Sequence, residues 1–449
     1  MNSFQQKFRK YINENRLFEP EDRILLAVSG GIDSSVLAHL LSREHAQWAM
    51  AHANFQLRAE ESDQDEAFIK SLAETYQVPC YTQTFDTKTY AQQQQISIQM
   101  AARELRRAWF LELLSQEKYD YIALAHHHND QLETLLLNVT KGTGISGLRA
   151  MLPKKGVWIR PLLFTVKKEV MAYAEEHQLH WQEERSNAED KYQRNWVRHR
   201  IIPALQKINP SVLSTSQHTL ARLREVEAIF KAEVDRVGQQ ALRMRGMEMV
   251  IQKTVLSSHP QATSLLTEWL SPYGFSWTDA RQIIISLQGE AQPGLQFLST
   301  SHTLWVDREE LVIIPQESEP ETISVTHEEA QITRTPLGHL QATVLHREKY
   351  QITAEPLVAA LDYQQLQFPL TLRTWEPGDA FQPLGMKHRK KVSDFLVDAK
   401  VPRYQKPQVL VVLSAGEIIW VVGHRVDHRF RVTDQTRQVY EIAWHPAKV

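Results

Sequence analysis

Residues 24–41 read Ile-Leu-Leu-Ala-Val-Ser-Gly-Gly-Ile-Asp-Ser-Ser-Val-Leu-Ala-His-Leu-Leu, and this stretch decides the fold of the first half of the chain. The apolar run 24–28 predicts a buried strand, and the amphipathic run from residue 36 predicts a helix. The first N–H groups of a helix lack backbone partners, and the helix dipole makes that end positive. Glycine lets the backbone approach a ligand with no Cβ in the way. The stretch 29–35 therefore predicts a cradle for phosphate.

An ordinary strand-to-helix turn is the alternative for so short a motif. Neither Gly-x-Gly-x-x-Gly nor the Gly-Lys-Ser/Thr of the Walker loop is present here. The order of buried strand, Ser-Gly-Gly-x-Asp-Ser and helix resembles the PP-loop of the ATP pyrophosphatases, which split ATP into AMP and pyrophosphate. This resemblance implies ATP and Mg²⁺ as cofactors, with Asp33 as the metal ligand, because Mg²⁺ is commonly held by few carboxylates plus phosphate oxygens. The implied nucleotide-binding residues are Ser29, Gly30, Gly31, Ile32, Asp33 and Ser34.

Length and composition exclude several classes of protein. A chain of 449 residues with 42% hydrophobic content can form two to four domains with real cores. It holds no run of about 20 apolar residues that could span a membrane, and residues 1–14 lack the apolar core of a signal peptide. We therefore expect a cytoplasmic protein with no membrane partner. Its single cysteine, Cys80, excludes a disulfide framework and is expected to pack as a small hydrophobe.

The chain is predicted to form three domains. Residues 1–205 alternate strands and helices, which indicates a parallel α/β sheet. Residues 206–315 are mostly helical and end in a hairpin, and 316–449 comprise a polar, acidic linker and a β-rich α+β domain. The expected strands of the first domain are 24–28, 48–52, 80–85 and 121–125. Because ligands bind at the carboxyl ends of such strands, the loops there should converge on one site.

Chemically loaded side chains follow two of these strands. His52 and Asn54 end the second strand, and residues 126–128 after the fourth are three consecutive histidines. Neighbouring positions point to different sides, so a zinc site is not expected at the histidines. Asp130 and Glu133 lie three residues apart at the start of a helix, so both carboxylates can face one pocket.

Arginines are spaced along two predicted helices. The helix 96–118 is expected to carry Arg103 and Arg106 on one face, and to bury a stripe formed by Ile98, Ala102, Leu105 and Trp109. Arg194 and Arg198 form a basic edge on a helix that ends before residue 203. On spacing alone, a solvated basic surface is the favoured explanation of the first pair.

Basic charge is concentrated at the C-terminal end. Residues 371–449 hold 13 lysines and arginines against 8 acidic residues, a net +5, whereas the whole chain has a net charge of −2. This patch includes Arg373, Lys390, Lys391 and Arg403, with aromatic residues such as Trp375 nearby. Such a surface fits phosphate contacts and base stacking in an RNA complex. A solvated basic surface is again the alternative.

In combination, these motifs resemble the tRNA(Ile)-lysidine synthetase family over nearly the whole length of the chain. The matching N-terminal pieces are 29–34, 52–54, 102–103 with Arg106, 127–130 with 133–134, 144 with 147–148, 160–162, and 186–187 with 194–195 and Arg198. The C-terminal pieces are Arg373, 378–379, 390–392, 394–395, 401–403 and Gly423. One departure is Asn129-Asp130, where the family often has two aspartates.

The resemblance implies a PP-loop, adenine nucleotide alpha hydrolase-like fold for 1–205, and tRNA-binding roles for 206–315 and 316–449. ATP would adenylate C2 of the wobble cytidine in the CAU anticodon of tRNA(Ile), and free L-lysine would then displace AMP to give lysidine. The implied catalytic residues are Asp33, Asp130, Glu133, Arg106, His52 and His127. The implied RNA-binding residues are Arg194, Arg198, Arg373, Lys390, Lys391 and Arg403.

The residue types agree with this chemistry. Asp130 and Glu133 suit the ammonium groups of lysine, and a carboxylate can serve as the base in the second step. Arg106 or Arg103 suits a carboxylate or a phosphate, while His52 and His127 could orient the base or move protons. The sequence does not indicate which carboxylate is the base. It also leaves open whether the chain forms a homodimer.

Two other functions compete with this one. Another PP-loop enzyme, such as a tRNA thiolase, an NAD synthetase or a GMP synthetase, would share the first motif. Thiolation usually needs several cysteines, and no glutamine amidotransferase half is visible. The second competing function is that of a non-catalytic tRNA-binding protein whose ATP loop is a relic. The joint presence of Asp33, Asp130 and Glu133 argues against this function.

Overall fold

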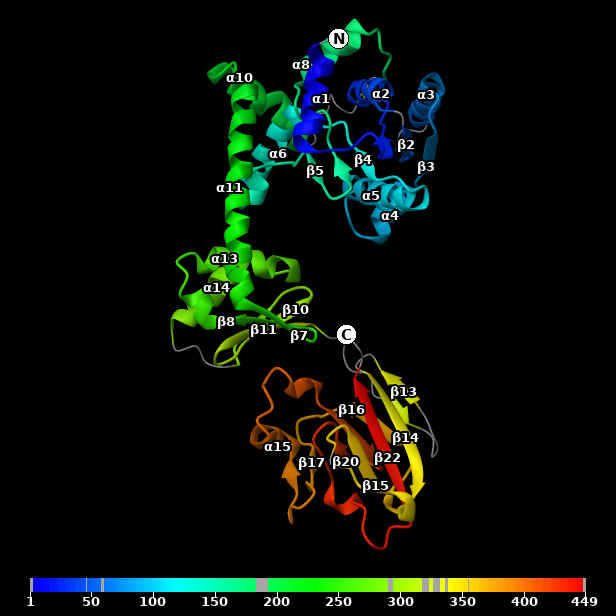
Figure 1. The fold of residues 1–449 in the computed structure, drawn as a ribbon, viewed down its shortest axis with the longest axis vertical. Coiled ribbons are helices and arrows are strands. Elements are labelled where there is room, and N and C mark those ends of the chain that lie inside the picture. The colour runs from blue at the N-terminus through cyan, green and yellow to red at the C-terminus, as the bar shows by residue number, and fades with distance from the viewer. Residues whose placement is uncertain are drawn as a thin grey trace. The chain divides into compact units, whose positions relative to one another are not determined.

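The computed structural model describes residues 3–45, 47–57, 60–182, 193–289, 294–316, 323–325, 332–335, 338–353 and 355–446. The chain divides into two compact units, residues 1–231 and 232–449. Helix α11 (Val212–Ala241) belongs to both units and is the long green helix of Figure 1. Within the described residues, no helix is long and apolar enough to cross a lipid bilayer.

The first unit is built on a six-stranded sheet with the order β3-β2-β1-β4-β6-β5. Neighbours are parallel, apart from the antiparallel pair β5–β6, which confirms the predicted α/β class. All four predicted strands are present, with ends that differ by one or two residues. The strands are β1 (Ile24–Ala27), β2 (Trp48–Asn54), β3 (Cys80–Thr84), β4 (Tyr121–Ala123), β5 (Lys154–Lys155) and β6 (Trp158–Ile159).

Helices cover both faces of this sheet. Ile24 and Leu26 of β1 pack into a core with the helices α1, α2, α3 and α8, while Leu25 between them faces a second core with α5. This alternation is the two-residue period of a strand that is buried on both faces. The helices are α1 (Ser3–Asn15), α2 (Ile32–Glu44), α3 (Glu60–Tyr76), α4 (Thr87–Gln93), α5 (Ile98–Gln116), α6 (His128–Lys141), α7 (Ile145–Leu148), α8 (Lys167–Glu176), α9 (Gln193–Trp196), a π-helical turn Val197–Ile201 and α10 (Ile202–Ile208).

The prediction for the buried face of α5 was wrong: the buried positions differ from the predicted ones by about one residue. The buried side chains are Ala101, Phe110 and Leu113, whereas Ile98 is 44% exposed. Phe110 and Leu113 pack against Leu25 in the second core. The expected stripe lies beside the true one, because adjacent helical positions are separated by only about 100°.

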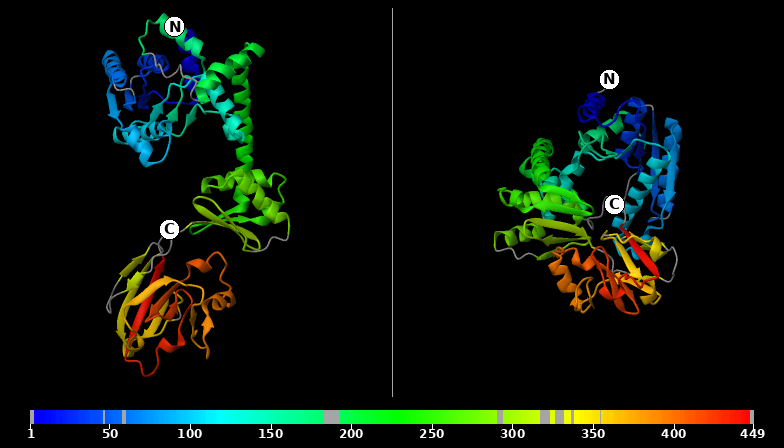
Figure 2. Two further views of the ribbon diagram at one scale, coloured as in Figure 1. Left: turned by 180° about the vertical axis from the view of Figure 1, so that it is seen from behind. Right: turned by 60° about the horizontal axis from the view of Figure 1, so that its bottom comes forward.

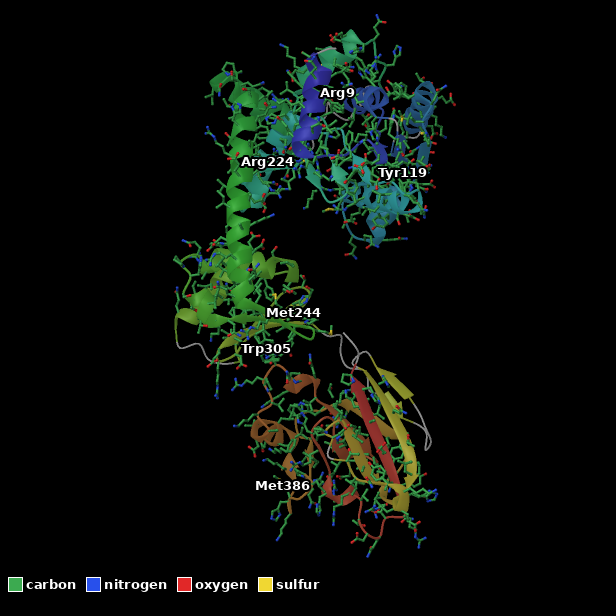
Figure 3. All side chains as sticks on the ribbon, in the orientation of Figure 1. Arg9, Tyr119, Arg224, Met244, Trp305 and Met386 are labelled. Atoms are coloured by element: carbon green, nitrogen blue, oxygen red, sulfur yellow. The ribbon has the colours of Figure 1, made fainter. Side chains whose placement is uncertain are left out.

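Polar side chains join α11 to α6 and its neighbouring loops in the first unit. His128 at the start of α6 contacts Ser216 of α11 at 2.8 Å between Nε2 and Oγ. Arg224, labelled on α11 in Figure 3, donates from Nη2 to the carbonyl of Met151 at 3.1 Å. Buried Glu227 of α11 accepts from Arg149. The contact face of α11 therefore includes buried polar pairs.

The second unit begins with helices and a sheet. Its helices confirm the mostly helical middle region, and a five-stranded sheet of order β7-β8-β11-β10-β9, which the sequence did not predict in full, accompanies them. The predicted hairpin is the antiparallel pair β10–β11. The elements are α12 (Lys253–Ser257), α13 (Ala262–Leu270), α14 (Trp277–Gln288), β7 (Leu242–Arg245), β8 (Glu248–Gln252), β9 (Gln296–Leu298), β10 (His302–Val306) and β11 (Glu310–Pro315). The predicted linker after it lies mostly outside the described residues.

The C-terminal part is β-rich, as predicted. Two sheets, β12-β16-β19-β20-β21 and β13-β14-β22-β15, share a core that includes Trp420 and Tyr440. Figure 2 shows β22, in red, within the second of these sheets. The elements are β12 (Ile323–Val325), β13 (Ile332–Thr335), β14 (Gly338–His346), β15 (Val358–Asp362), β16 (Leu370–Thr374), β17 (Ala380–Phe381), β18 (Lys390–Lys391), α15 (Val392–Asp398), β19 (Leu410–Ser414), β20 (Glu417–Val421), β21 (Arg425–Val426) and β22 (Gln438–Pro446).

Candidate active site

A cavity of about 1150 Å³ opens in the first unit, at the carboxyl ends of β1, β2 and β4. The loops that follow these strands do converge, as the parallel topology predicts. All six predicted catalytic residues line this cavity. The lining side chains used below are those of Ser29, Asp33, His52, Asn54, Arg106, His126, His127, Asn129, Asp130, Glu133, Lys167 and Arg198.

The loop 29–35 lines one side of the cavity. Gly30 has a φ of +86°, a left-handed conformation that favours glycine, and Gly31 is the N-cap of α2 with no side-chain cap hydrogen bond. Ser34 instead turns back and donates from Oγ to the Gly31 carbonyl at 2.8 Å. Ser35 Oγ is buried with no hydrogen-bond partner among the described residues. The first turn of α2 thus keeps amides available for an anion.

Asp33 lies in the first turn of α2 and makes a two-pronged contact with a lysine from another helix. Lys167 Nζ is 2.8 Å from both carboxylate oxygens of Asp33. His127 Nε2 lies 3.7 Å from Asp33 Oδ1. The side chains of Asp33 and Lys167 are 29% and 36% exposed, so this ion pair is open to solvent.

A second acidic pair lies deeper, on the first turns of α6. Glu133 is fully buried and accepts hydrogen bonds of 2.6 Å from Nε of both Arg194 and Arg198. Arg194 also donates to Asp130 Oδ1 at 2.8 Å. The other Asp130 oxygen accepts from the backbone N–H of His127 at 2.9 Å, which closes a capping box. Two carboxylates and two guanidiniums therefore neutralise one another.

The ionisation of this group follows from its surroundings. Burial alone would raise the pKa of Asp130, but His127 and His126 when protonated, together with the charge of Arg194, outweigh burial and hold that pKa below its usual range. Asp130 is therefore ionised at neutral pH. Burial lowers the pKa of His126 to about 4, and nearby arginines act in the same direction, so this imidazole is neutral. Its Nδ1 is buried and has no hydrogen-bond partner among the described residues.

The remaining predicted residues either hold the loops around the cavity in place or lie on the cavity wall. His52 is buried and its Nδ1 lies 3.0 Å from the carbonyl of Val28, which joins β2 to the end of β1. Asn54 donates from Nδ2 to Glu66 of α3 at 3.1 Å and accepts from the N–H of Gln56, so it fixes the loop after β2. Arg106 is an exposed residue at the cavity wall.

The predicted RNA-binding residues fall into two groups. Arg194 and Arg198 lie against Glu133, as described above, and not on a free basic edge. The others belong to the second unit: Arg373 pairs with Asp379 through two contacts of 2.8 and 2.9 Å, and Lys390 pairs with Asp398. Lys391 and Arg403 are exposed. Their role in binding RNA stays a prediction.

Sequence reasoning missed Lys167 and His126. His126 was named only as one of three histidines, and no pattern separated it from its neighbours. Lys167 had a detectable signal: with Lys168 it begins α8, where two cations oppose the helix dipole. Cys80 packs at the edge of the α2 side of the sheet, where burial raises the pKa of its thiol, and it does not line the cavity.

A metal ion at Asp33 would have few protein ligands. No group of three or more His, Cys, Asp or Glu side chains able to hold a metal occurs among the residues described. Asp130 and Glu133 are held by buried arginine contacts, whereas the part-exposed carboxylate of Asp33 adjoins the phosphate cradle and suits a cation. One carboxylate beside a phosphate cradle fits Mg²⁺, which takes its remaining ligands from phosphate and water.

Comparisons with known proteins agree with this geometry. Residues 1–205 match the model of the PP-loop domain, 244–316 that of the TilS substrate binding domain and 370–444 that of the TilS substrate C-terminal domain. The tRNA(Ile)-lysidine synthase of Parabacteroides distasonis is 36% identical over 96% of this chain and 97% of its own. That of Bacteroides thetaiotaomicron is 34% identical over 97% of this chain and 98% of its own.

Among solved structures, the U34-tRNA thiolase NcsA from Methanococcus maripaludis is 20% identical with a TM-score of 0.41, and covers 49% of this chain and 79% of its own. That likeness is too weak to carry an argument about function. The relatives matched over nearly their full length, together with the three family models, show that this chain belongs to the tRNA(Ile)-lysidine synthase family of ligases.

Proposed function

We propose that the chain ligates free L-lysine to C2 of the wobble cytidine in the CAU anticodon of tRNA(Ile), at the expense of ATP. The observation that carries this proposal is the content of one cavity. It holds a phosphate cradle with an adjoining carboxylate, Asp33, and a separate buried acidic pair, Asp130 and Glu133, that suits a cationic amino acid. Its volume of about 1150 Å³ exceeds the upper end of ordinary small-ligand pockets.

In the first step, the C2 oxygen of cytidine forms a bond to the α-phosphorus of ATP, and pyrophosphate leaves. The amides of the first turn of α2 and the hydroxyl of Ser29 are placed to bind the phosphates. Asp33 would hold Mg²⁺, which when bound neutralises charge on the leaving pyrophosphate. His127, between Asp33 and Asp130, is placed to orient the groups that react.

In the second step, the ε-amine of lysine forms a bond to C2, and AMP leaves with the former C2 oxygen. The amine must be unprotonated when it attacks, so a nearby group must accept its proton. Asp130 has one oxygen fixed by its own helix cap, and Glu133 is saturated by arginines. Lysine would therefore bind at the cavity face of Asp130, with Arg194 and Arg198 left in place on Glu133. Arg106 on the cavity wall would receive the lysine carboxylate.

Thiolation is the alternative with the same first step. It would require a sulfur donor at the cavity. The only cysteine of the chain is Cys80, which lies in β3 and does not line the cavity. This placement favours an amine as the second substrate.

The decisive experiment combines the purified chain with ATP, lysine and a tRNA(Ile) transcript that carries a CAU anticodon. AMP release is expected only when both lysine and this transcript are present. The matched control is the same transcript with the wobble cytidine changed to uridine, which removes the reacting base. AMP release without lysine, or none at all, contradicts the proposal.

A further inference from the structure

Lys167 has no assigned role, yet it makes the closest charged contact of the phosphate cradle. Its Nζ lies 2.8 Å from both oxygens of Asp33, so the ammonium neutralises the carboxylate that would hold a metal ion. Lysine at this place has a compact charge on a flexible stem, which is the side chain best able to move away from a partner.

The backbone of Lys167 is held by hydrogen bonds to neighbouring elements. Its N–H donates to Asn129 Oδ1 at 3.0 Å, and the adjacent Thr165 carbonyl accepts from the N–H of His128 at 2.8 Å. The start of α8 is thereby joined to the start of α6. In addition, Tyr173 of α8 contacts His39 of α2 at 3.1 Å. The lysine thus projects from a rigid base toward a cradle on a helix packed against its own.

A loop that binds nucleotide phosphates is commonly assisted by a cationic side chain that reaches the phosphates. The Walker loop carries a lysine within its own motif that reaches the phosphates, whereas residues 29–35 contain no basic residue. The lysine and arginine side chains among the described residues that line the cavity are Lys167, Arg106 and Arg198. Arg198 is bound to Glu133, whereas Lys167 contacts Asp33 of the cradle. A cation at the start of a helix also opposes the dipole, so its presence at the start of α8 is not explained by helix stability.

We propose that Lys167 is a placeholder cation, which neutralises Asp33 in the nucleotide-free enzyme and moves to the phosphates when a metal–nucleotide complex takes Asp33. One ammonium would then serve two anions in turn, since a divalent cation and an ammonium repel each other at one carboxylate. The inference rests on the proposed function for the identity of the nucleotide. Its central element, competition between Lys167 and a metal for Asp33, can be tested without turnover.

The test titrates the nucleotide-free full chain with Mn²⁺ alone and follows binding by electron paramagnetic resonance. Lys167→Met removes the competitor, so Mn²⁺ should bind about fivefold more tightly than in the wild type, the scale set by a part-exposed ion pair. Lys168→Met is the matched control, since it removes the same charge from the adjacent exposed position of α8 and should leave Mn²⁺ affinity unchanged. Adding Asp33→Asn to Lys167→Met should abolish the gain.

The second measurement is the rate of pyrophosphate release with ATP and the CAU transcript. Lys167→Met should slow this release about a hundredfold, the cost of losing one donor to transition-state charge, and Lys167→Arg should restore part of the rate. Lys167→Met should therefore raise Mn²⁺ affinity and lower the rate of pyrophosphate release. A lysine with a merely structural role would not change these two quantities in opposite directions. Equal Mn²⁺ affinities in Lys167→Met and wild type overturn the proposal, as does an effect confined to the KM for lysine. If the wild type itself makes no lysidine, the proposed function fails while the Mn²⁺ comparison still decides the competition.

Discussion

Two carboxylate sites of the same cavity are held in opposite ways. Asp33 is part-exposed and is matched by one flexible lysine, whereas Glu133 is fully buried and receives three hydrogen bonds of 2.6 to 3.1 Å from two arginines. Breaking a buried pair is costly and an exposed pair contributes little. The difference separates a site that can exchange its cation from a site that is fixed in place.

The partner residues reinforce this division. Guanidinium groups are planar and donate in a rigid fork, and Arg194 and Arg198 come from consecutive short helical segments. Burial alone would lower the pKa of Arg198, but the hydrogen bond and charge of Glu133 raise it, so this arginine stays charged. The following predictions separate the exchangeable site from the fixed one, from the largest effect to the smallest.

Asp33→Asn should abolish adenylation and leave the fold intact. The change removes the carboxylate that suits a metal at the exchangeable site, so pyrophosphate release should fall at least about a thousandfold. The free energy of unfolding should change by about 1 kcal/mol or less, because the side chain is solvated. The two are measured by a pyrophosphate assay and by calorimetry of the full chain. A large loss of stability with normal turnover per folded molecule would reverse the assignment of the two sites.

Glu133→Gln should destabilise the first unit. It leaves two arginines of the fixed site without a countercharge, which is expected to cost about 3 kcal/mol. Glu175→Gln in α8, an exposed position, is the control and should change stability by about 0.5 kcal/mol or less. Thermal unfolding of both variants measures the difference. Equal stability of the two variants would mean that the arginine cluster is not a structural element.

His128, at the start of the helix that carries Asp130 and Glu133, makes the stability of the first unit sensitive to acid. Burial lowers its pKa from 6.5 to about 4, so the folded state resists a proton that the unfolded state accepts. This contribution to stability is complete above pH 6.5 and is lost as the pH falls toward 4, with about 2 kcal/mol gone at pH 5. His128→Gln should therefore be most destabilising near pH 7, and its difference from wild type should narrow by about 2 kcal/mol at pH 5. A pH-independent difference would show that His128 titrates normally.

Arg403→Ala should affect RNA binding alone. Loss of one exposed phosphate contact is expected to weaken tRNA binding about fivefold and to reduce its salt dependence. ATP binding should be unchanged, because Arg403 belongs to the second unit and the cradle to the first. Filter binding with tRNA and equilibrium dialysis with ATP give the two affinities. Equal losses of both would contradict a tRNA-binding role separate from the nucleotide site.

Much of the fold could be predicted because its signals are local. The apolar run 24–28 and the glycine loop after it require a strand, a turn and a helix, and parallel topology then brings distant strand ends together. What could not be predicted depends on tertiary partners. The buried face of α5 differs from the predicted one because Phe110 is buried in the core with Leu25, whereas Trp109 is only partly buried against it. The sheet β7–β11 joins short strands separated by three helices, which leave little periodicity to detect.

The site shows the same limit. Asp33, Asp130 and Glu133 could be named because their residue types and spacing carry meaning in one dimension. The contacts of Arg194 and Arg198 with Glu133 could not be predicted from the sequence, because 61 and 65 residues separate the partners. Asn129 shows why a departure can be harmless: its Oδ1 accepts the N–H of Lys167 at 3.0 Å, a bond that an aspartate oxygen would also accept.

The most direct test of the account is to identify the anticodon nucleoside after reaction. The wild-type chain and Asp33→Asn are each incubated with ATP, radiolabelled lysine and the CAU tRNA(Ile) transcript, and the digested tRNA is analysed by chromatography and mass spectrometry. The account predicts labelled lysine on the wobble cytidine with the wild type and none with Asp33→Asn. Label incorporated equally by Asp33→Asn, or ATP consumed by the wild type with the cytidine unchanged, would contradict it.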